Sequence, residues 1–230
     1  MSKINMMNGD CMEYMASLPD NAYELAIVDP PYGIGASTQT FTREGKQTGK
    51  SLCVSGLNYK KSDWDDAIPS KDYFLQLMRV TKNQIIFGGN YFIDYLKSTP
   101  CFLVWDKQTG QNLYADCELA WTSFNLAVRK FEFQWKGMLQ GNMKNKESRI
   151  HPTQKPVALY KWLLKNYAKP GDKILDTHGG SGSICIACHD MGFDLDWIEL
   201  DEDYYNAAMK RFNTHTAQGS LFEFEGGNIA

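Results

Sequence analysis

The sequence predicts an α/β fold in which a doubly wound, mostly parallel sheet ends in an antiparallel edge. Two observations support this prediction. Apolar runs of strand length alternate with stretches of helical periodicity along most of the chain. At 176–183 a glycine-rich turn joins a strand-like run to a helix-like run, as in doubly wound sheets that bind nucleotides. The length of 230 residues, 43% of them hydrophobic, is sufficient for one domain with a substantial core.

The expected elements follow from local patterns, taken in chain order. In the first part, strands are expected at Ile4–Asn8, Tyr23–Asp29 and Gln84–Phe87, and helices at Met12–Leu18, Lys71–Thr81 and Tyr91–Leu96. Three apolar runs with short connections are expected as strands of the antiparallel edge, at Phe102–Trp105, Glu118–Trp121 and Leu126–Val128. Further on, strands are expected at Lys173–Asp176 and Leu195–Leu200, and helices at Pro156–Ala168, Ser183–Met191 and Tyr204–Phe212. Pro156 suits a first helical position, where its missing N–H would have no partner.

The chain is expected to form a single domain covering 1–230, because no repeat or linker divides it. Two stretches lack periodicity, Gly33–Lys61 and Lys136–Arg149. Loops longer than ~15 residues in a compact domain are usually functional. We therefore expect small insertions at about 33–63 and 129–150 that contact a substrate.

The charge is unevenly distributed, although the net charge is only −3. Basic residues gather around the two aperiodic stretches: Arg43, Lys46, Lys50, Lys60 and Lys61 at the first, and Arg129, Lys130, Lys136, Lys144, Lys146, Arg149 and Lys155 at the second. Two basic segments on an acidic body predict a nucleic-acid-binding face. Lysine-rich solvated loops are an equally good account of the charge alone, and this alternative stays open.

Composition also bears on the compartment. No apolar run approaches the ~20 residues that span a bilayer, so no membrane partner is expected. The first ten residues lack the apolar run and cleavage site of a signal peptide. Six cysteines in a chain of this length, without an export signal, indicate reduced thiols and a cytoplasmic location.

The first motif that indicates chemistry is the turn Asp176-Thr-His-Gly-Gly-Ser-Gly-Ser183. Backbone amides of such a turn approach a bound nucleotide. The next strand ends at Glu199, whose carboxylate can accept hydrogen bonds from ribose hydroxyls. The spacing is not G-x-G-x-x-G, and the acidic surroundings disfavour a pyrophosphate. The motif predicts a nucleoside-type cofactor without phosphates, and a tight bend without a ligand is the alternative.

The second motif is Asp29-Pro30-Pro31-Tyr32, at the carboxyl end of an expected buried strand. The prolines fix the backbone and remove N–H donors, so the Asp29 carboxylate and the Pro30 carbonyl remain as converging acceptors. Tyr32 adds a flat ring beside them. These groups suit an exocyclic amine on a π-system, which describes a nucleobase; a rigid turn after a strand is the alternative.

The third motif is His151-Pro-Thr-Gln-Lys-Pro156, between a basic segment and a helix. Thr153, Lys155 and the free amides of the helix could hold a carboxylate, and a simple capping segment is the alternative. A zinc site at Cys185-Ile-Ala-Cys188-His189 lacks a second ligand pair with suitable spacing. Buried small side chains explain these two cysteines better, so no metal is expected.

Together these motifs make the sequence similar to the beta class of S-adenosylmethionine-dependent DNA amino methyltransferases, which methylate adenine N6 or cytosine N4. The resemblance covers nearly the whole chain, through Asn8–Cys11, Asp29–Tyr32, Phe87–Phe92, His151–Pro156, Asp176–Gly182 and Glu199. The catalytic motif precedes the cofactor motif, which is the permuted order of this class. The resemblance implies the Rossmann-like class I methyltransferase fold.

The resemblance also implies roles for individual residues. S-adenosylmethionine would be bound by Asp10, Cys11, His151, Thr153, Lys155, Asp176, His178, Gly180, Ser181, Gly182 and Glu199. Asp29, Pro30, Pro31 and Tyr32 would form the catalytic motif, in which Asp29 and the Pro30 carbonyl bind the target amine and Tyr32 stacks on the flipped base. The substrate would be double-stranded DNA, contacted by Arg43, Lys46, Lys50, Lys60, Lys61, Lys136, Lys144, Lys146 and Arg149. The amine would attack the methyl group directly and in line, without a protein nucleophile.

The sequence departs from the family pattern at the cofactor turn. Thr177 and His178 stand where the family more often has Pro and Phe, so this chain lacks the Phe that makes an apolar contact with the cofactor, and His178 could stack in its place. Asp at position 29 usually accompanies adenine and Ser cytosine, so adenine N6 is the expected target. Cytosine N4, an RNA base or a protein amide, and a catalytically silent DNA-binding relative are the alternatives. A homodimer is compatible with so small a recognition region.

Overall fold

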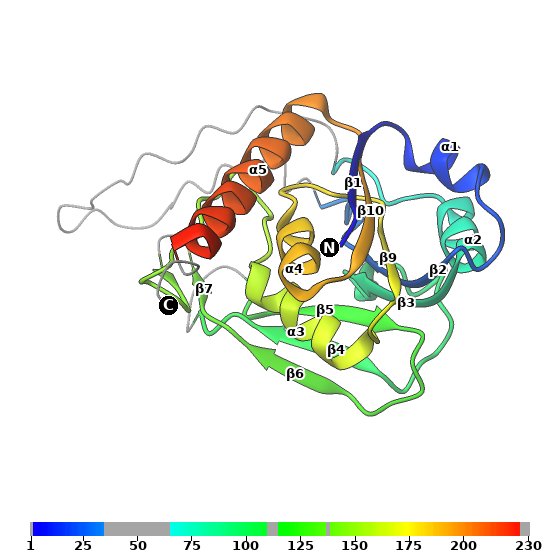
Figure 1. The fold of residues 1–230 in the computed structure, drawn as a ribbon. Helices are drawn as coiled ribbons and strands as arrows, with labels where there is room; N and C mark the ends of the chain where they lie inside the picture. Colours follow the sequence, from blue (N-terminus) through cyan, green and yellow to red (C-terminus); the bar gives the residue numbers. More distant parts are fainter. Residues whose placement is uncertain (1, 35–64, 110–114, 137–138, 226–230) are drawn as a thin grey trace.

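A sheet of eight strands forms the centre of the part that the computed structural model describes, which is residues 2–34, 65–109, 115–136 and 139–225 (Figure 1). The strand order is β1-β10-β9-β2-β3-β5-β4-β6. The strands are β1 (Ile4–Asn8), β2 (Tyr23–Val28), β3 (Thr81–Phe87), β4 (Phe102–Asp106), β5 (Cys117–Thr122), β6 (Arg129–Glu132), β9 (Lys173–Asp176) and β10 (Asp194–Glu199). All of them run in one direction except β5. A separate hairpin pairs β7 (Trp135–Lys136) with β8 (Leu139–Gln140).

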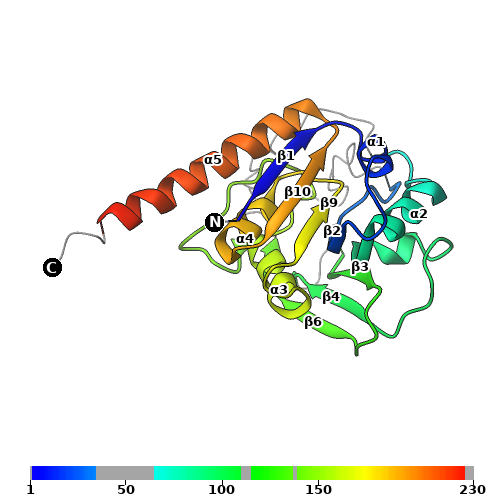
Figure 2. The same cartoon turned by 45° about the vertical axis from the view of Figure 1, so that its right-hand side comes forward.

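Helices cover both faces of the sheet (Figure 2). One face carries α1 (Cys11–Ala16) and α2 (Lys71–Val80), and the other carries α3 (Val157–Tyr167), α4 (Ser183–Met191) and α5 (Glu202–Glu225). Alternation along β2 explains this arrangement: Leu25 and Ile27 are buried with the side chains of α3 and α4, whereas Ala26 and Val28 are buried with those of α1 and α2. The sheet is therefore doubly wound, and its core is split into two layers. The predicted fold class is confirmed.

The expected parallel core agrees closely with the structure. The strand Ile4–Asn8 and the helix Ser183–Met191 have the predicted bounds. Gly182 before this helix and Gly192 after it have φ of 66° and 78°, values that favour glycine, and they define both of its ends. Cys185 and Cys188 lie fully buried on the same helix, in the core as expected. Pro156 is the N-cap of α3 and not its first residue, so this helix begins one residue later than predicted, at Val157.

Two expected elements near the antiparallel edge are wrong. The stretch Tyr91–Leu96 is not an α-helix; a single 3-10 turn, η1 (Gly89–Tyr91), is followed by turns in which Phe92 accepts two backbone hydrogen bonds. Phe92 is fully buried there, whereas Ile93 is 66% exposed, so the apolar residues do not share one buried face.

Leu126–Val128 is not a strand either, and its apolar side chains are exposed. The strand β6 begins at Arg129 instead and pairs with β4 in parallel. It belongs to the stretch that the sequence assigned to recognition. Because β6 is the last strand of its sheet and mostly exposed, its sequence lacks the apolar alternation that would have revealed it. The hairpin β7–β8 likewise gives structure to part of the expected loop at 136–149.

Within the described ranges, no helix is both long enough and apolar enough to cross a membrane.

Candidate active site

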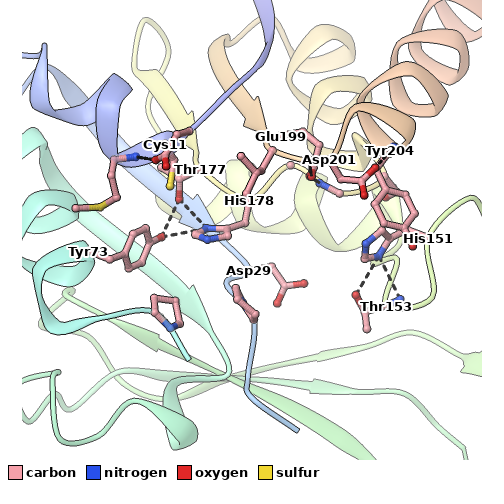
Figure 3. A pocket seen from close by; sticks show the side chains of 18 of the residues that line it. Cys11, Asp29, Tyr73, His151, Thr153, Thr177, His178, Glu199, Asp201 and Tyr204 are labelled. Carbon is pink, nitrogen blue, oxygen red and sulfur yellow. Dashed lines mark hydrogen bonds between the residues drawn. The ribbon is translucent and has the colours of Figure 1, made fainter. Parts of the chain in front are cut away.

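A cavity of about 500 Å³ opens at the carboxyl ends of the adjacent strands β1, β10, β9 and β2. This is where ligands bind in open α/β sheets, and the volume is within the roughly 300–1,000 Å³ of small-molecule sites. The cavity brings together these residues of the predicted site: Asp10, Cys11, Asp29, Pro31, His151, Thr153, Lys155, His178, Gly180, Ser181 and Glu199. Figure 3 shows Asp29 and His178 near its middle, His151 and Tyr204 at one end, and Cys11 and Tyr73 at the other.

The glycine-rich turn after β9 forms one wall of the cavity. Gly180 and Gly182 have φ of 52° and 66°, a left-handed conformation that side chains disfavour. Gly179 lies against the ring of Trp197, and a Cβ at this position would be only 1.9 Å from the ring. The turn therefore needs glycine for two separate reasons, conformation and space.

Glu199 holds this turn in place from the end of β10. Its carboxylate accepts a hydrogen bond from the Gly180 N–H at 2.6 Å and another from the Asp201 N–H at 2.8 Å. Burial raises the pKa of Glu199, although both of these hydrogen bonds favour the charged form. The side chain reaches the cavity on the side of Asp201 and Tyr204 (Figure 3).

The departure at Thr177 and His178 is accommodated by a residue that the sequence did not single out. The Tyr73 hydroxyl from α2 lies 2.7 Å from the Thr177 hydroxyl, which in turn lies 3.0 Å from His178 Nδ1 (Figure 3). The Tyr73 and His178 rings also pack edge to face at 5.0 Å. Burial lowers the pKa of His178 to about 4, so this ring is neutral near pH 7. A polar cluster thus fixes His178 in the cavity wall.

At the other end of the cavity, His151 is fixed in a similar way. Its Nδ1 accepts from the Thr153 N–H at 3.3 Å and lies 3.1 Å from the Thr153 hydroxyl. Its ring packs at 4.3 Å from Tyr204 of α5, another residue that the sequence analysis missed. Burial, with a smaller contribution from nearby Lys155, lowers the pKa of His151 to about 3. This imidazole is therefore neutral as well.

Asp10 and Cys11 begin α1 at the end of β1. Asp10 accepts a hydrogen bond from the Met12 N–H at 2.6 Å and is the N-cap of this helix. Burial, followed by the charge of Asp10, raises the pKa of the Cys11 thiol to about 12, so Cys11 is not a nucleophile.

Asp176 lies below the turn, fully buried at the end of β9. It accepts a hydrogen bond from the His178 N–H at 3.0 Å. Burial is the main cause that raises the pKa of Asp176 to about 8, and the nearby charges of Asp29 and Glu199 raise it further. Asp176 itself does not line the cavity, but it lies near two carboxyl groups that do, Asp29 and Glu199.

Asp29 and Tyr32 form a compact pair at the end of β2. The Tyr32 hydroxyl donates to Asp29 Oδ1 at 2.6 Å, and the Lys155 ammonium pairs with Asp29 Oδ2. Burial raises the pKa of Asp29, while the adjacent Lys155 opposes this rise. The ring of Tyr91 stacks on Tyr32 at 5.0 Å, and Gly88 lies so close that a Cβ there would touch the Tyr32 ring at 2.2 Å. One face of Tyr32 is therefore already covered.

Lys155 contacts a second carboxylate that the sequence analysis did not connect with the site. Its ammonium lies 3.1 Å from Glu118 Oε2, and Glu118 Oε1 lies 2.5 Å from the Lys107 ammonium. Although burial favours the neutral acid, Lys155 and Lys107 hold the pKa of Glu118 at about 2. Burial also opposes the charge on Lys155, but Asp29 and Glu118 outweigh it and raise the Lys155 pKa. The only sequence signal was an acidic residue at the start of an apolar strand.

The segment His151–Pro156 is anchored to the hairpin β7–β8. The Trp135 indole donates to the Gln154 carbonyl at 2.9 Å, and Gln154 Oε1 accepts from the Ile150 N–H at 2.9 Å. Glu147 links the hairpin to α3. Its N–H donates to Gln140 Oε1 of β8 at 2.8 Å, and its carboxylate accepts from the Val157 N–H at the start of α3 at 3.0 Å.

Arg211 of α5 ties the same Glu147 to the cofactor turn. Its guanidinium donates to Glu147 Oε2 at 2.7 Å and to the Ser181 carbonyl at 2.8 Å. The stretch 139–149 is thus held by specific contacts to α3, α5 and the turn.

The predicted DNA contacts are placed only in part. Lys144 and Lys146 are exposed, Lys136 donates to the Thr109 carbonyl at 2.9 Å, and the Arg149 guanidinium stacks over Trp135 at 4.6 Å. The remaining predicted residues, Arg43, Lys46, Lys50, Lys60 and Lys61, lie outside the described residues.

Comparisons with known proteins give consistent results. A family model described as DNA methylase, which groups N6 and N4 methyltransferases, matches residues 94–210. The Escherichia coli (strain K12) protein YubD is 28% identical over 214 residues, which cover 89% of this chain and 88% of YubD. The type II methyltransferase M.HinfI of Haemophilus influenzae is 22% identical over 249 residues, which cover 90% of this chain and 67% of that protein.

Two solved structures are similar in fold. The complex of M1.HpyAVI with SAM has a TM-score of 0.55 and 21% identity, and the match covers 90% of this chain and 99% of that one. The PvuII DNA methyltransferase, which is cytosine-N4-specific, has a TM-score of 0.59 and 13% identity, with 94% and 91% covered.

Proposed function

The chain belongs to the family of N6 and N4 DNA methylases, and on this premise we propose that it transfers a methyl group from S-adenosylmethionine to N6 of adenine in double-stranded DNA. The observation that carries the proposal is the position of Asp29. Its carboxylate, held by Tyr32 and Lys155, lines the same cavity as the glycine-rich turn and Glu199. An acceptor for the amine and a cradle for the methyl donor thus meet in one cavity.

The cavity suits a nucleoside cofactor that carries an amino acid and no phosphate. Glu199 in its lining can accept hydrogen bonds from ribose hydroxyls, and the rings of His151 and His178, also in the lining, are neutral near pH 7. Such a bound cofactor supplies an electrophilic methyl group on a sulfonium. Asp176, close to Asp29 and Glu199, would favour the positive charge of the methionine part.

We expect Glu199→Ala to weaken cofactor binding more than it slows catalysis. The variant loses the proposed ribose contact and also the hydrogen bond that holds the Gly180 N–H. A charge-assisted hydrogen bond contributes about 1.5–3 kcal/mol, so the Kd should rise about 10- to 100-fold. Calorimetric titration measures the Kd, and single-turnover kinetics at saturating cofactor should retain a measurable rate. An unchanged Kd would contradict the assignment of Glu199.

Cofactor binding should release a proton from Asp176. The pKa of this carboxyl is raised to about 8 in the free protein, and a cationic ligand beside it favours the ionised form. Affinity should therefore increase as the pH rises toward 8 and level off above it. His151 and His178 are already neutral near pH 7 and do not contribute. Titrations at pH 7 in buffers of different ionisation enthalpy give the number of protons released.

The matched control for proton release is Asp176→Asn, which has the same shape but no ionisable proton. This variant should bind the cofactor with a heat that does not depend on the buffer. If the wild-type heat were also independent of the buffer, the proposed linkage would be wrong.

The target adenine would have to leave the duplex, because its N6 is paired inside the base stack. Asp29 and the Pro30 carbonyl would accept the two N6 hydrogens, which directs the nitrogen lone pair toward the methyl group. Pro31 has no N–H to compete for these acceptors. The base can stack on Tyr32 only where Tyr91 does not cover the ring. Much of the acceleration would come from positioning and electrostatics.

Adenine is proposed because Asp rather than Ser stands at position 29, as in the adenine-specific members that the sequence resembles. The fold does not decide between the bases, because the similar PvuII enzyme is cytosine-N4-specific. The test is nucleoside analysis of DNA that has been incubated with the protein and S-adenosylmethionine. N6-methyladenine is expected, and N4-methylcytosine alone, or no methylated base, would overturn the assignment.

We further propose that a single domain, 1–230, holds both the cofactor site and the site of the target base. DNA would lie along its basic insertions at about 33–63 and 129–150. Lys144 and Lys146 are its exposed contacts in the second insertion. Replacing both by alanine should raise the Kd for DNA and reduce the slope of log K against log salt by roughly two phosphate contacts. Replacing Lys3 and Lys169, which are exposed and lie outside both insertions, is the control for the loss of two positive charges. An unchanged slope in the Lys144/Lys146 variant would remove these residues from the DNA face.

A further inference from the structure

A row of alternating charges runs from Asp29 in the cavity wall to side chains of β5 and the end of β4. It consists of Asp29 at the end of β2, Lys155 before α3, Glu118 at the start of β5 and Lys107 just after β4. Only Asp29 and Lys155 line the cavity among these four described residues. Glu118 therefore lies behind the residues that would meet a substrate.

Burial of Lys155 makes its two carboxylate partners necessary. Lys155 is only 3% exposed, and its ammonium lies 4.6 Å from the centre of the Phe87 ring. A buried ammonium is stable only with charged or polar partners. Here the partners are two carboxylates, Asp29 at the end of β2 and Glu118 in β5. Lys107 neutralises the second carboxylate from its far side. The row has no net charge as a whole.

This arrangement fixes the orientation of Asp29. One carboxylate oxygen receives the Tyr32 hydroxyl and the other receives Lys155. Lys155 has a long, flexible side chain, and its ammonium is restrained laterally by the contact with Glu118 at 3.1 Å. If Glu118 were uncharged, Lys155 would have one anionic partner instead of two and could follow Asp29 in several rotamers. The plane of the Asp29 carboxylate would then be less well defined.

We propose that Glu118 is a positioning residue for methyl transfer, which acts through Lys155 to orient the Asp29 carboxylate toward the target amine. This inference rests on the proposed function. It assigns a role to the antiparallel strand β5, of which Ala120, Trp121 and Thr122 are buried. Lys155 is then part of the amine-binding side of the cavity, and not only a contact for the cofactor.

The test is a double-mutant cycle on the full-length protein. Glu118→Gln removes the charge and keeps the shape, and Lys155→Met removes the ammonium. The single-turnover rate with saturating DNA and cofactor should fall by about 10²-fold in Glu118→Gln, the loss typical of a misplaced reacting group. The Kd for S-adenosylmethionine should stay within about 3-fold of the wild type, since Glu118 does not line the cavity. A merely structural residue would lower the unfolding midpoint without this selective loss of rate.

The double variant tests whether Glu118 acts through Lys155. If it does, adding Glu118→Gln to Lys155→Met should change the rate by less than about 3-fold. The matched control is Glu24→Gln, which removes an ion-paired carboxylate at the other end of β2, 3.0 Å from Lys82. Its rate should equal that of the wild type.

Three outcomes would overturn the proposal. One is a rate within about 3-fold of the wild type in Glu118→Gln, and another is full additivity of the two substitutions. If Glu118→Gln does not fold, Glu118→Asp takes its place in the test, because it keeps the charge but withdraws the carboxylate by one methylene. The third outcome is then a wild-type rate in Glu118→Asp. A wild-type protein that transfers no methyl group would instead refute the proposed function, and the role of Glu118 with it.

Discussion

Replacing Asp29 by alanine is expected to abolish methyl transfer while the Kd for S-adenosylmethionine changes by less than about 3-fold. The variant removes the only side-chain carboxylate that is held between Tyr32 and Lys155 in the described cavity wall. Asp29→Asn should also lose at least about 10²-fold in rate, because its amide presents a donor to the amine where an acceptor is needed. Calorimetric cofactor titration and single-turnover kinetics on the same preparations separate binding from chemistry.

The matched control for Asp29 is Tyr32→Phe. This change deletes the hydroxyl that donates to Asp29 but keeps the ring for stacking. A hydrogen bond to a charged group contributes about 1.5 kcal/mol at the low end of its range, and Lys155 still holds the other oxygen of Asp29, so the rate should fall only about 10-fold. A rate for Asp29→Ala close to that of the wild type would show that the amine is bound elsewhere.

Replacing Gly179 by alanine is expected to be the most destabilising single methyl addition in the cofactor turn. The new Cβ would come within 1.9 Å of the Trp197 ring, and Trp197 is fully buried. The backbone cannot withdraw easily, since the Gly179 N–H donates to the Ile198 carbonyl at 2.9 Å and its carbonyl accepts from the Gly182 N–H at 3.1 Å. The free energy of unfolding should fall by about 3 kcal/mol. Chemical denaturation measures this change.

Gly9→Ala is the control for Gly179. It lies at the end of β1, and a Cβ there would meet no atom within 4 Å. Its cost should be within about 0.5 kcal/mol, as for other substitutions that disturb no contact. Equal losses of stability in Gly9→Ala and Gly179→Ala would mean that the close approach of Gly179 to Trp197 does not exclude a side chain at position 179.

The sequence was most informative where local pattern and burial coincide. The parallel strands are buried on both faces and read as apolar runs, and glycines with positive φ define both ends of α4. The same signals failed at the antiparallel edge. Tyr91–Leu96 and Leu126–Val128 are apolar but partly exposed, and β6 is polar because it is the last strand. In each case the segment is partly or mostly exposed, so its pattern of apolar residues does not indicate its secondary structure.

The sequence by itself determined the doubly wound sheet, the glycine-rich turn and the motif around Asp29, because short-range periodicity and backbone geometry specify them. Only the tertiary structure decided which charged groups stand behind Asp29. Lys155 is 126 residues away from it in the chain, and Glu118 comes from the strand that runs against the others. The physical reason is that a buried charge must meet an opposite charge in space. Which one it meets depends on how the crossovers bring distant strand ends together, and no local pattern records this.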